Sequence, residues 1–287
     1  MSNQAGNALR IYQGPTISTG TISKIVVNGF NGKPKHPSTS WSTAVSVYDN
    51  SGVTTNAISN VILDGFYIDC SNLGSSGTGT PAAISVQTGG GDICISNGTL
   101  DNVSVSFGVV VGYNTTVNNC YIYGCLTDSI FLNTGYCLIS NNFLEVAGRS
   151  GVYLASGAIH NVVQGNQIQS TTGAAITEAA GAGYTTAIGN SITSSGACSI
   201  VNNGNSVYAN NTGLNPIGTF AIGPTGSPFT YTSAYTNETV TVFGGTVSSI
   251  TINGIGTGAT SGAFNIPPHT PIVVTYSAGP TMTKTVF

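Results

Sequence analysis

Residues that could do catalytic chemistry are few in this chain. It has nine Asp and Glu and six Lys and Arg among 287 residues. Hydrolysis of a glycosidic bond needs two carboxylates roughly 5–10 Å apart, and a lyase typically needs a base with a cationic group or a Ca²⁺ site. Asp128, Glu145, Arg149 and Glu178 could supply such groups. An outward ion pair, which would contribute at most about 1 kcal/mol to stability, is the simpler interpretation of the same residues.

Whether these side chains meet depends on a short pattern that returns along the chain. In its clearest copies an apolar residue is followed, after two spacers, by Asn. These register positions are Asn142, Asn166, Asn190 and Asn210, and earlier copies carry Phe30, Phe66, Gly98 and Cys120 instead. Consecutive register positions differ in sequence number by 36, 32, 22, 22, 24, 24 and 20. A recurrent spacing of this size indicates a solenoid.

Each period also carries a second run of residues that favour strands. Examples are Ala83–Val86, Ser129–Leu132 and Gly151–Leu154, where β-branched and aromatic residues are enriched. No stretch shows a helical apolar stripe, and Gly at 39 positions disfavours helices. Coils of two or three strands each, stacked in parallel, form a β-helix in which neighbouring coils bury a shared core. Asp128 and Arg149 each precede such a run, so we expect them on adjacent coils.

The Asn positions are predicted to be structural. Asn tolerates the left-handed backbone of a sharp bend, and an inward Asn can hydrogen-bond to the Asn of the next coil. Asn142, Asn166, Asn190 and Asn210 are therefore expected to form a ladder. Gly98 is expected to make its bend alone, while Phe30, Phe66 and Cys120 fill the same slot with apolar bulk.

The coil length and the Asn ladder together resemble the pectin-lyase-like superfamily, which includes polysaccharide lyases, glycoside hydrolases and phage tailspikes. The resemblance covers about residues 20–215 and rests on no catalytic signature. It implies an all-β chain built on a right-handed parallel β-helix of about eight coils, assigned here to residues 21–214. Residues 1–20 are expected to be an irregular lead-in or a cap.

The composition changes after the last coil. Pro and Gly punctuate residues 215–228, which predict a linker. Short alternating runs and turns follow in residues 229–287 and predict a small antiparallel β-sandwich. Within it, residues 244–250 and 272–277 resemble C-terminal modules of phage tail and fibre proteins.

Charge and cysteine content exclude several classes of function. Only 5% of the residues are charged, too few for a nucleic-acid or acidic-lipid surface. No apolar run reaches the 18 or so residues of a membrane span, and the N-terminus lacks the features of a signal peptide. The six Cys and three His show no metal-ligand spacing, so no metal or cofactor is predicted and the cysteines are expected to be mostly reduced and buried.

One further spot could bind a ligand. Lys33, Lys35 and Trp41 share an insertion between the first two coils, where they could contact a sugar or a partner. A solvated loop with one aromatic ring packed on the coils is the simpler interpretation.

The favoured hypothesis is a structural or receptor-binding protein of a virion tail or an extracellular fibre. It would be virion-associated or extracellular, and would self-associate as a trimer or an end-to-end fibre, with a surface polysaccharide as a further candidate partner. One alternative is a polysaccharide lyase or glycoside hydrolase of the pectin-lyase-like type, although an enzyme is not favoured. The other is a secreted surface adhesin.

Overall fold

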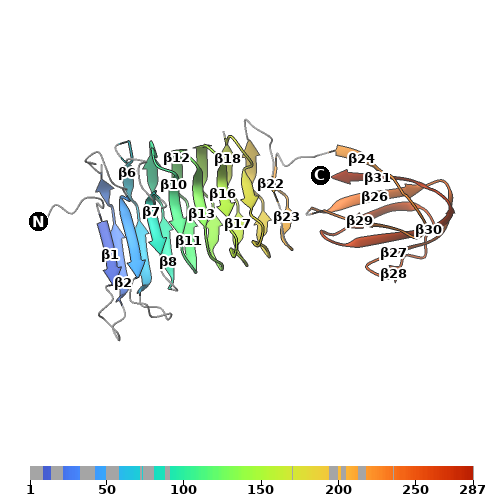
Figure 1. Ribbon diagram of the computed structural model, residues 1–287, viewed down its shortest axis with the longest axis horizontal. Helices are drawn as coiled ribbons and strands as arrows, with labels where there is room; N and C mark the ends of the chain where they lie inside the picture. The colour runs from blue at the N-terminus through green and yellow to red at the C-terminus, as the bar shows by residue number, and fades with distance from the viewer. Residues whose placement is uncertain are drawn as a thin grey trace, which may run out of the picture. The chain divides into compact units, whose positions relative to one another are not determined.

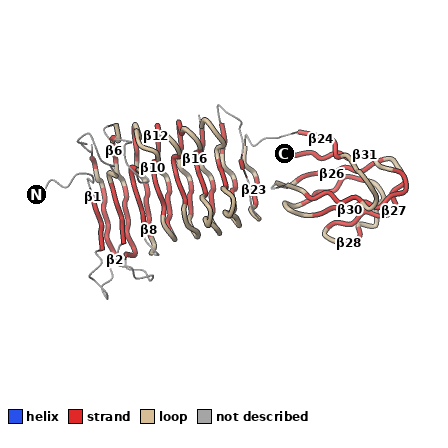
Figure 2. The backbone as a smooth tube through the Cα atoms, in the orientation of Figure 1, coloured by secondary structure: helices blue, strands red, loops and turns tan. Residues whose placement is uncertain are grey.

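The computed structural model describes residues 9–13, 22–32, 43–49, 58–71, 73, 81–87, 91–169, 171–193, 200–201, 205–212, 218–234 and 236–286. These residues form strands and loops (Figure 2). None of the described segments forms a helix that could cross a membrane. The chain divides into two compact units. The first holds residues 1–204 and 211–213, and the second holds residues 214–287 together with the short segment 205–210, which contains the last strand of a parallel sheet.

The first unit is a parallel β-helix, as predicted, in which each coil adds a strand to three parallel sheets (Figure 1). Sheet 1 contains β1 (Leu9–Gln13), β4 (Val45–Asp49), β7 (Ala82–Gln87), β10 (Phe107–Val111), β13 (Asp128–Leu132), β16 (Ser150–Leu154), β19 (Ile176–Glu178) and β22 (Ile200–Val201). Sheet 2 contains β2 (Ile22–Asn28), β5 (Ile58–Asp64), β8 (Ile93–Ser96), β11 (Thr115–Asn118), β14 (Leu138–Ser140), β17 (Val162–Gln164), β20 (Thr186–Ile188) and β23 (Val207–Ala209). Sheet 3 contains β3 (Asn31–Gly32), β6 (Tyr67–Asp69), β9 (Thr99–Asp101), β12 (Tyr121–Cys125), β15 (Phe143–Ala147), β18 (Gln167–Gln169) and β21 (Ser191–Thr193).

The register of sheet 3 confirms most of the predicted coil lengths. The paired residues are Asn31, Tyr67, Thr99, Tyr121, Phe143, Gln167 and Ser191. Each of them lies directly after a predicted register position, so the intervals between them equal the predicted ones. The last interval differs, because Ser191 pairs with Thr212, whereas the predicted step would have ended at Asn211.

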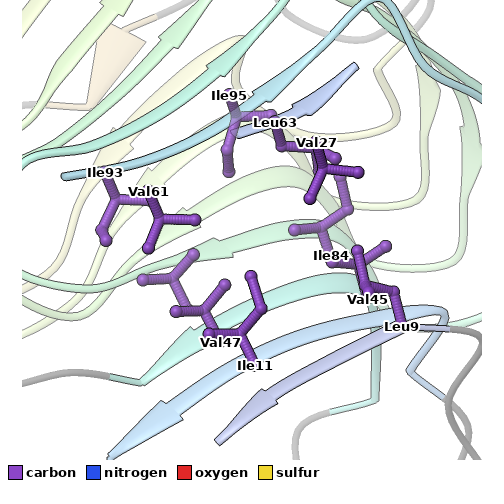
Figure 3. A pocket seen from close by; sticks show the side chains of 11 residues that line it. Leu9, Ile11, Val27, Val45, Val47, Val61, Leu63, Ile84, Ile93 and Ile95 are labelled. Carbon is purple, nitrogen blue, oxygen red and sulfur yellow. The ribbon is translucent and has the colours of Figure 1, made fainter. Parts of the chain in front are cut away.

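The core of the β-helix is a column of aliphatic side chains that point inward from the sheets. Ile68, Leu100, Ile122, Leu144 and Ile168 follow one another on sheet 3 and are all fully buried. In the first coils the aliphatic chains of sheets 1 and 2 leave a cavity of about 10 Å³ (Figure 3). Its lining has no polar surface, so the cavity offers a water molecule no hydrogen-bonding partner.

The bend between sheets 2 and 3 is made by the residue immediately before each register position. In every coil this residue has a left-handed backbone, with φ between 52° and 65°. The residues are Gly29, Gly65, Asn97, Asn119, Asn141, Gly165, Gly189 and Asn210. Gly and Asn occupy all eight positions, and these two residue types adopt the left-handed conformation at low cost.

The prediction that Gly98 makes its own bend is therefore wrong. Asn97 bends the chain, with φ at 52°. Gly98 instead makes room for Phe66, since a Cβ atom on Gly98 would lie 2.0 Å from Cζ of that ring. Phe66 and Cys120 are buried in the inward slot, as expected, whereas Phe30 is only half-buried.

The inward Asn residues form the predicted ladder. The amide nitrogen of Asn142 donates to Oδ1 of Asn166 at 3.0 Å, and Asn166 donates to Asn190 in the same way. The side-chain oxygen Oδ1 of Asn166 and of Asn190 also accepts a hydrogen bond from the backbone N–H of the preceding ladder residue. The side-chain nitrogen Nδ2 also donates to a carbonyl oxygen of the previous coil, as that of Asn166 does to Ile139 at 2.9 Å. These buried amides therefore have their hydrogen bonds satisfied without water.

The fourth rung of the ladder is Asn211, and the assignment of Asn210 is wrong. Asn190 Nδ2 donates to Oδ1 of Asn211 at 2.8 Å, whereas Asn210 is exposed and makes the bend. The pair Asn141 and Asn142 has the same division, with the first Asn at the bend and the second inside.

Two boundaries also differ from the expectation. Residues 9–13, assigned to the lead-in 1–20, form β1, which pairs with β4 in the β-helix. The expected linker 215–228 includes β24 (Gly218–Ile222), which is a strand of the second unit. β24 lies among Gly and Pro residues, which in sequence are typical of a linker.

The second unit is an antiparallel sandwich of two four-stranded sheets, as predicted. Sheet 4 contains β24, β31 (Thr281–Val286), β26 (Glu238–Phe243) and β29 (Gly262–Ile266). Sheet 5 contains β25 (Phe229–Thr232), β30 (Pro271–Ala278), β27 (Thr246–Ile252) and β28 (Ile255–Gly256). Ile222, Val240 and Met282 of sheet 4 share one buried cluster with Ile250 and Val274 of sheet 5, so the two sheets pack face to face.

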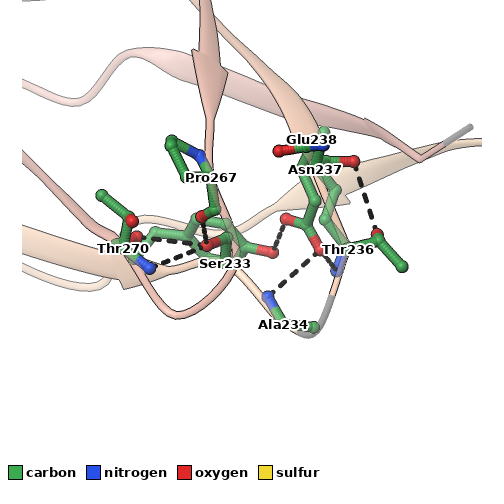
Figure 4. A network of polar contacts seen from close by, with 9 residues as sticks. Ser233, Ala234, Thr236, Asn237, Glu238, Pro267 and Thr270 are labelled. Carbon is green, nitrogen blue, oxygen red and sulfur yellow. Dashed lines mark hydrogen bonds and ion pairs between the residues drawn. The ribbon is translucent and has the colours of Figure 1, made fainter. Parts of the chain in front are cut away.

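Glu238 carries a buried charge in this sandwich. Its side chain is 1% exposed, and Lys284 lies 3.3 Å from Oε1. The Tyr231 hydroxyl and the backbone N–H of Ala234 also donate to the carboxylate. Beside it, Ser233 donates to the carbonyl oxygens of Pro267 and Thr270 (Figure 4). These bonds compensate the burial of the carboxylate and tie the loop between β25 and β26 to sheet 4.

We expect Asn166→Asp to destabilise the β-helix by about 1–3 kcal/mol at neutral pH. The new carboxylate places an acceptor where Nδ2 donated to Ile139 and Asn190. The midpoint of thermal unfolding, followed by circular dichroism, should fall by several degrees. Asn210→Asp is the matched control, because this exposed residue only makes the bend. Equal midpoints for the two variants would contradict a structural ladder.

Candidate functional site

Asp128 and Arg149 meet on adjacent coils, as expected. Arg149 Nε donates to Asp128 Oδ1 at 3.0 Å, and its Nη2 donates to the other carboxylate oxygen. The backbone N–H of Ser150 also donates to Oδ1 at 3.1 Å. The guanidinium carbon lies 3.7 Å from the centre of the Tyr153 ring. The interpretation as a merely outward pair is wrong, because Asp128 is completely buried while Arg149 is 43% exposed.

Burial dominates the electrostatics of this pair. It raises the pKa of Asp128 above its ordinary value, and the hydrogen bonds from Arg149 and Ser150 only partly oppose that effect. The hydrogen bond to Asp128 in turn raises the pKa of Arg149. Both oxygens of Asp128 are engaged by donors, so the geometry indicates an anchor between coils and not a carboxylate poised to transfer a proton.

The other two candidate carboxylates lie elsewhere on the β-helix. Glu145 is on sheet 3, where its Oε2 accepts the Tyr121 hydroxyl at 3.0 Å. Glu178 is the last residue of β19 and is fully buried, whereas Asp128 is the first residue of β13 in the same parallel sheet. The four charged residues therefore do not form one cluster. Lys33, Lys35 and Trp41 lie outside the residues that the structure describes.

Four of the five cysteines in the described part of the chain are buried thiols. Cys70, Cys94, Cys120, Cys125 and Cys137 are free thiols, and all but Cys94 are buried. Burial raises the pKa of Cys70 and of Cys120 to about 12, so both stay protonated at neutral pH. Cys198 lies outside the described residues.

The outer face of sheet 3 gathers aromatic and acidic side chains in two columns. The first column contains Tyr67, Thr99, Tyr121, Phe143, Gln167 and Ser191. The second contains Asp69, Asp101, Tyr123, Glu145, Gln169 and Thr193. These side chains alternate with the buried core residues along each strand, so they point away from the core.

Contacts between coils fix the orientation of these groups. The Tyr121 ring stacks against Tyr123, with centroids 6.3 Å apart, and against Phe143 at 5.4 Å. The Tyr67 hydroxyl donates to Asp101 at 3.3 Å, which repeats the bond from Tyr121 to Glu145 two coils later. Burial, and then the bond to Glu145, raise the pKa of Tyr121 to about 12, so its hydroxyl remains a donor at neutral pH.

A groove of about 270 Å³ runs beside the first column, at the bend between sheets 2 and 3. Asn97, Asn119 and Asn141 line one side, and Thr99, Tyr121 and Phe143 line the other. Gly98 and Cys120 lie between them. The Asn side chains are themselves ordered, since Asn119 donates to Asn97 at 2.7 Å and Asn141 donates to Asn118 at 3.1 Å. The groove thus offers amides on one side and aromatic rings on the other.

The sequence signal for this face is an equal offset from the register positions, and not a local acidic motif. Asp69, Asp101 and Glu145 each lie three positions after a register position, at 66, 98 and 142. Residues at equal offsets in a solenoid stack on one another. Their equal offsets therefore predict that these carboxylates share one face. The different offset of Asp128 predicts that it lies on another face than Glu145.

Comparisons with known proteins add little beyond this geometry. No family model matches the sequence, and no curated protein matches it. Among solved structures, the chain is similar to the crystal structure of the Dettilon tailspike protein, with a TM-score of 0.38 and 11% sequence identity. The match covers 98% of this chain and 85% of that chain.

Arg149→Met should destabilise the fold, because it leaves the buried carboxylate of Asp128 without its charged partner. We expect the free energy of unfolding to fall by about 2 kcal/mol at pH near 7. This loss is smaller than that for breaking a fully buried ion pair, because Arg149 is 43% exposed. Burial raises the pKa of Asp128 in the folded state, so the fold binds its proton more readily than the unfolded chain. Because Arg149 lowers the pKa of Asp128, its removal should raise that pKa further. The loss should therefore shrink as the pH falls, first through the pKa of Asp128 in the variant and then through its lower value in the native chain.

Urea unfolding across a pH series measures this loss. The double variant Asp128→Asn, Arg149→Met is the matched control, because without the carboxylate its loss relative to the native chain should lack that recovery at low pH. A loss in the single variant that is constant with pH would contradict the role assigned to Asp128.

Proposed function

We propose that the chain is a structural and receptor-binding protein of a virion tail or an extracellular fibre, and that its β-helix binds a surface glycan in the groove on sheet 3. The observation that carries the proposal is the pairing of amides with aromatic rings along one groove. Sugar rings present apolar faces that stack on aromatic side chains, and hydroxyl groups that bond to amides and carboxylates. Sites of this kind combine apolar contact with a few placed polar groups.

The groove is suited to a polymer. Its side chains recur once per coil, with adjacent strands about 4.8 Å apart, and the amides of Asn97, Asn119 and Asn141 come from three successive coils. An extended chain lying along the coil axis would meet similar groups at each step. A rigid scaffold keeps such contacts preorganised, which lowers the entropic cost of binding.

Self-association is the second part of the proposal. β22 and β23 end their sheets in the described chain, and an open strand edge can pair with another chain unless charges protect it. Residues 179–237 contain no Asp, Glu, Lys or Arg. The low charge of the whole chain, with 15 charged residues in 287, gives little electrostatic protection against association. We infer a homo-oligomer, either a trimer or an end-to-end fibre.

Tyr121→Ala should weaken glycan binding at least tenfold, because it removes the ring that stacks with Phe143 and lines the groove. A panel of neutral and charged polysaccharides, tested by affinity electrophoresis, would first find a ligand. Tyr136→Ala is the matched control, since Tyr136 is 52% exposed at the turn between sheets 1 and 2. Equal binding by the two variants, or no ligand in the panel, would overturn the proposal. Release of shorter fragments, abolished by Glu145→Gln, would favour the glycosidase or lyase alternative.

Sedimentation of the full chain tests the assembly. We expect a species heavier than the 29.0 kDa monomer at micromolar concentration. Removing residues 218–287, which include every strand of the sandwich, should change the distribution of species. A monomer in both cases would contradict self-association and leave the binding proposal standing.

A further inference from the structure

We propose that the groove on sheet 3 selects glycans that carry free amino groups, prefers them to neutral glycans of the same backbone, and rejects glycans that carry carboxylates. This inference rests on the proposed function and names the chemical class of its ligand. It follows from the signs and positions of the charges around the groove.

The second column of sheet 3 carries three carboxylates, on the same outer face as the first column, whose residues Thr99, Tyr121 and Phe143 line the groove. Asp69 and Asp101 are paired in register, one coil apart, and Glu145 occupies the same column two coils beyond Asp101. The Tyr121 hydroxyl holds the Glu145 carboxylate next to a ring that lines the groove. A ligand stacked on Tyr121 would therefore lie close to a negative charge.

A fourth carboxylate lies at the end of the groove. Asp64 Oδ1 accepts Asn97 Nδ2 and Ser96 Oγ, both at 2.7 Å, and Asn97 lines the groove. These hydrogen bonds lower the pKa of Asp64, so this carboxylate remains charged at neutral pH. Four of the nine acidic residues of the chain are thus gathered around one face.

No basic residue balances them among the described strands of sheet 3, none of which contains Lys or Arg. Arg149 follows β15, but its guanidinium is bound to Asp128 and packed on Tyr153. Arg10 and Lys24 belong to strands of sheets 1 and 2. The described part of this face is therefore uniformly negative.

The expected preference is moderate because the carboxylates are partly exposed. Exposed ion pairs change an affinity by roughly one- to fivefold each. The carboxylates recur along the coil axis at spacings comparable with the Debye length of about 8–10 Å, so a polymer with several amino groups would feel more than one of them. The same carboxylates would repel the carboxylates of a uronate polymer and weaken its binding by a similar factor.

The test compares three oligosaccharides with the full chain by isothermal titration at low salt and at mildly acidic pH, where the amino groups of glucosamine are protonated. They are an N-acetylated chito-oligosaccharide, its de-N-acetylated form with free amines, and an oligogalacturonate. We expect the amine form to bind several-fold more tightly than the neutral form, and the galacturonate to bind most weakly. The difference should shrink at high salt because it is electrostatic.

Variants assign the preference to the groove. Asp101→Asn should reduce the ratio of amine to neutral affinity and improve galacturonate binding relative to both. Asp92→Asn removes the same charge from an exposed site that bonds to Asn114, away from the groove, and should leave the ratio unchanged. Tyr121→Ala should weaken all three ligands, because it removes the stacking surface.

The outcomes separate the two proposals. Tyr121-dependent binding of all three ligands with equal affinity, or tightest binding of galacturonate, would overturn the charge preference and keep the glycan-binding function. Amine binding that survives Tyr121→Ala and is matched by polylysine would show general attraction of cations, which also overturns the preference. Binding of none of the three by the native chain would overturn both.

Discussion

The rest of this structure depends on one requirement, that successive coils stack in parallel and in register. The inward amides of Asn142, Asn166, Asn190 and Asn211 enforce it, because each of them bonds to residues of the neighbouring coil and the first three also donate to the next Asn. A slip of one residue would leave several buried polar groups without partners, at about 1–3 kcal/mol each. The left-handed Gly and Asn column beside the ladder makes the bends that bring each amide inside.

Register in turn determines the outer surface. Once the coils are aligned, residues at the same offset stack into columns with about 4.8 Å between successive members, so aromatic and acidic residues that recur in several coils come to lie on one face. This explains why Tyr67 with Asp101 and Tyr121 with Glu145 make equivalent bonds two coils apart. A solenoid can build a long site from residues that are isolated in sequence.

Of the three buried acidic residues in the described chain, Asp128, Glu178 and Glu238, two are explained by a basic residue that binds them. Asp128 is held by Arg149 between coils, and Glu238 is held by Lys284 in the sandwich. Both carboxylates are almost fully buried and both have further hydrogen-bond donors. Of the described acidic residues with exposed surface, Asp64, Asp69, Asp101 and Glu145 lie around the face that carries the groove, whereas Asp92 lies away from it.

The sequence by itself determined the class of fold, the coil lengths and the ladder as far as Asn190. These features repeat, so each copy supports the others, and local propensity agrees with the period. It also placed Asp128 beside Arg149, because both precede equivalent strands. Where the repeat weakened, at residues 9–13, 210–211 and 218–222, the assignments failed.

Only the tertiary structure decided which side chains share a site. Asp128 and Glu145 fall within a single coil length of each other in sequence, yet they belong to different sheets. Asp101 and Glu145 are separated by two full coils of chain and share a column. Burial likewise depends on neighbouring coils, which is why Asp128 is inside although its local sequence is that of a surface turn. In a solenoid, the closest neighbours of a residue lie a full coil away along the chain, so proximity along the sequence is a poor guide to proximity in space.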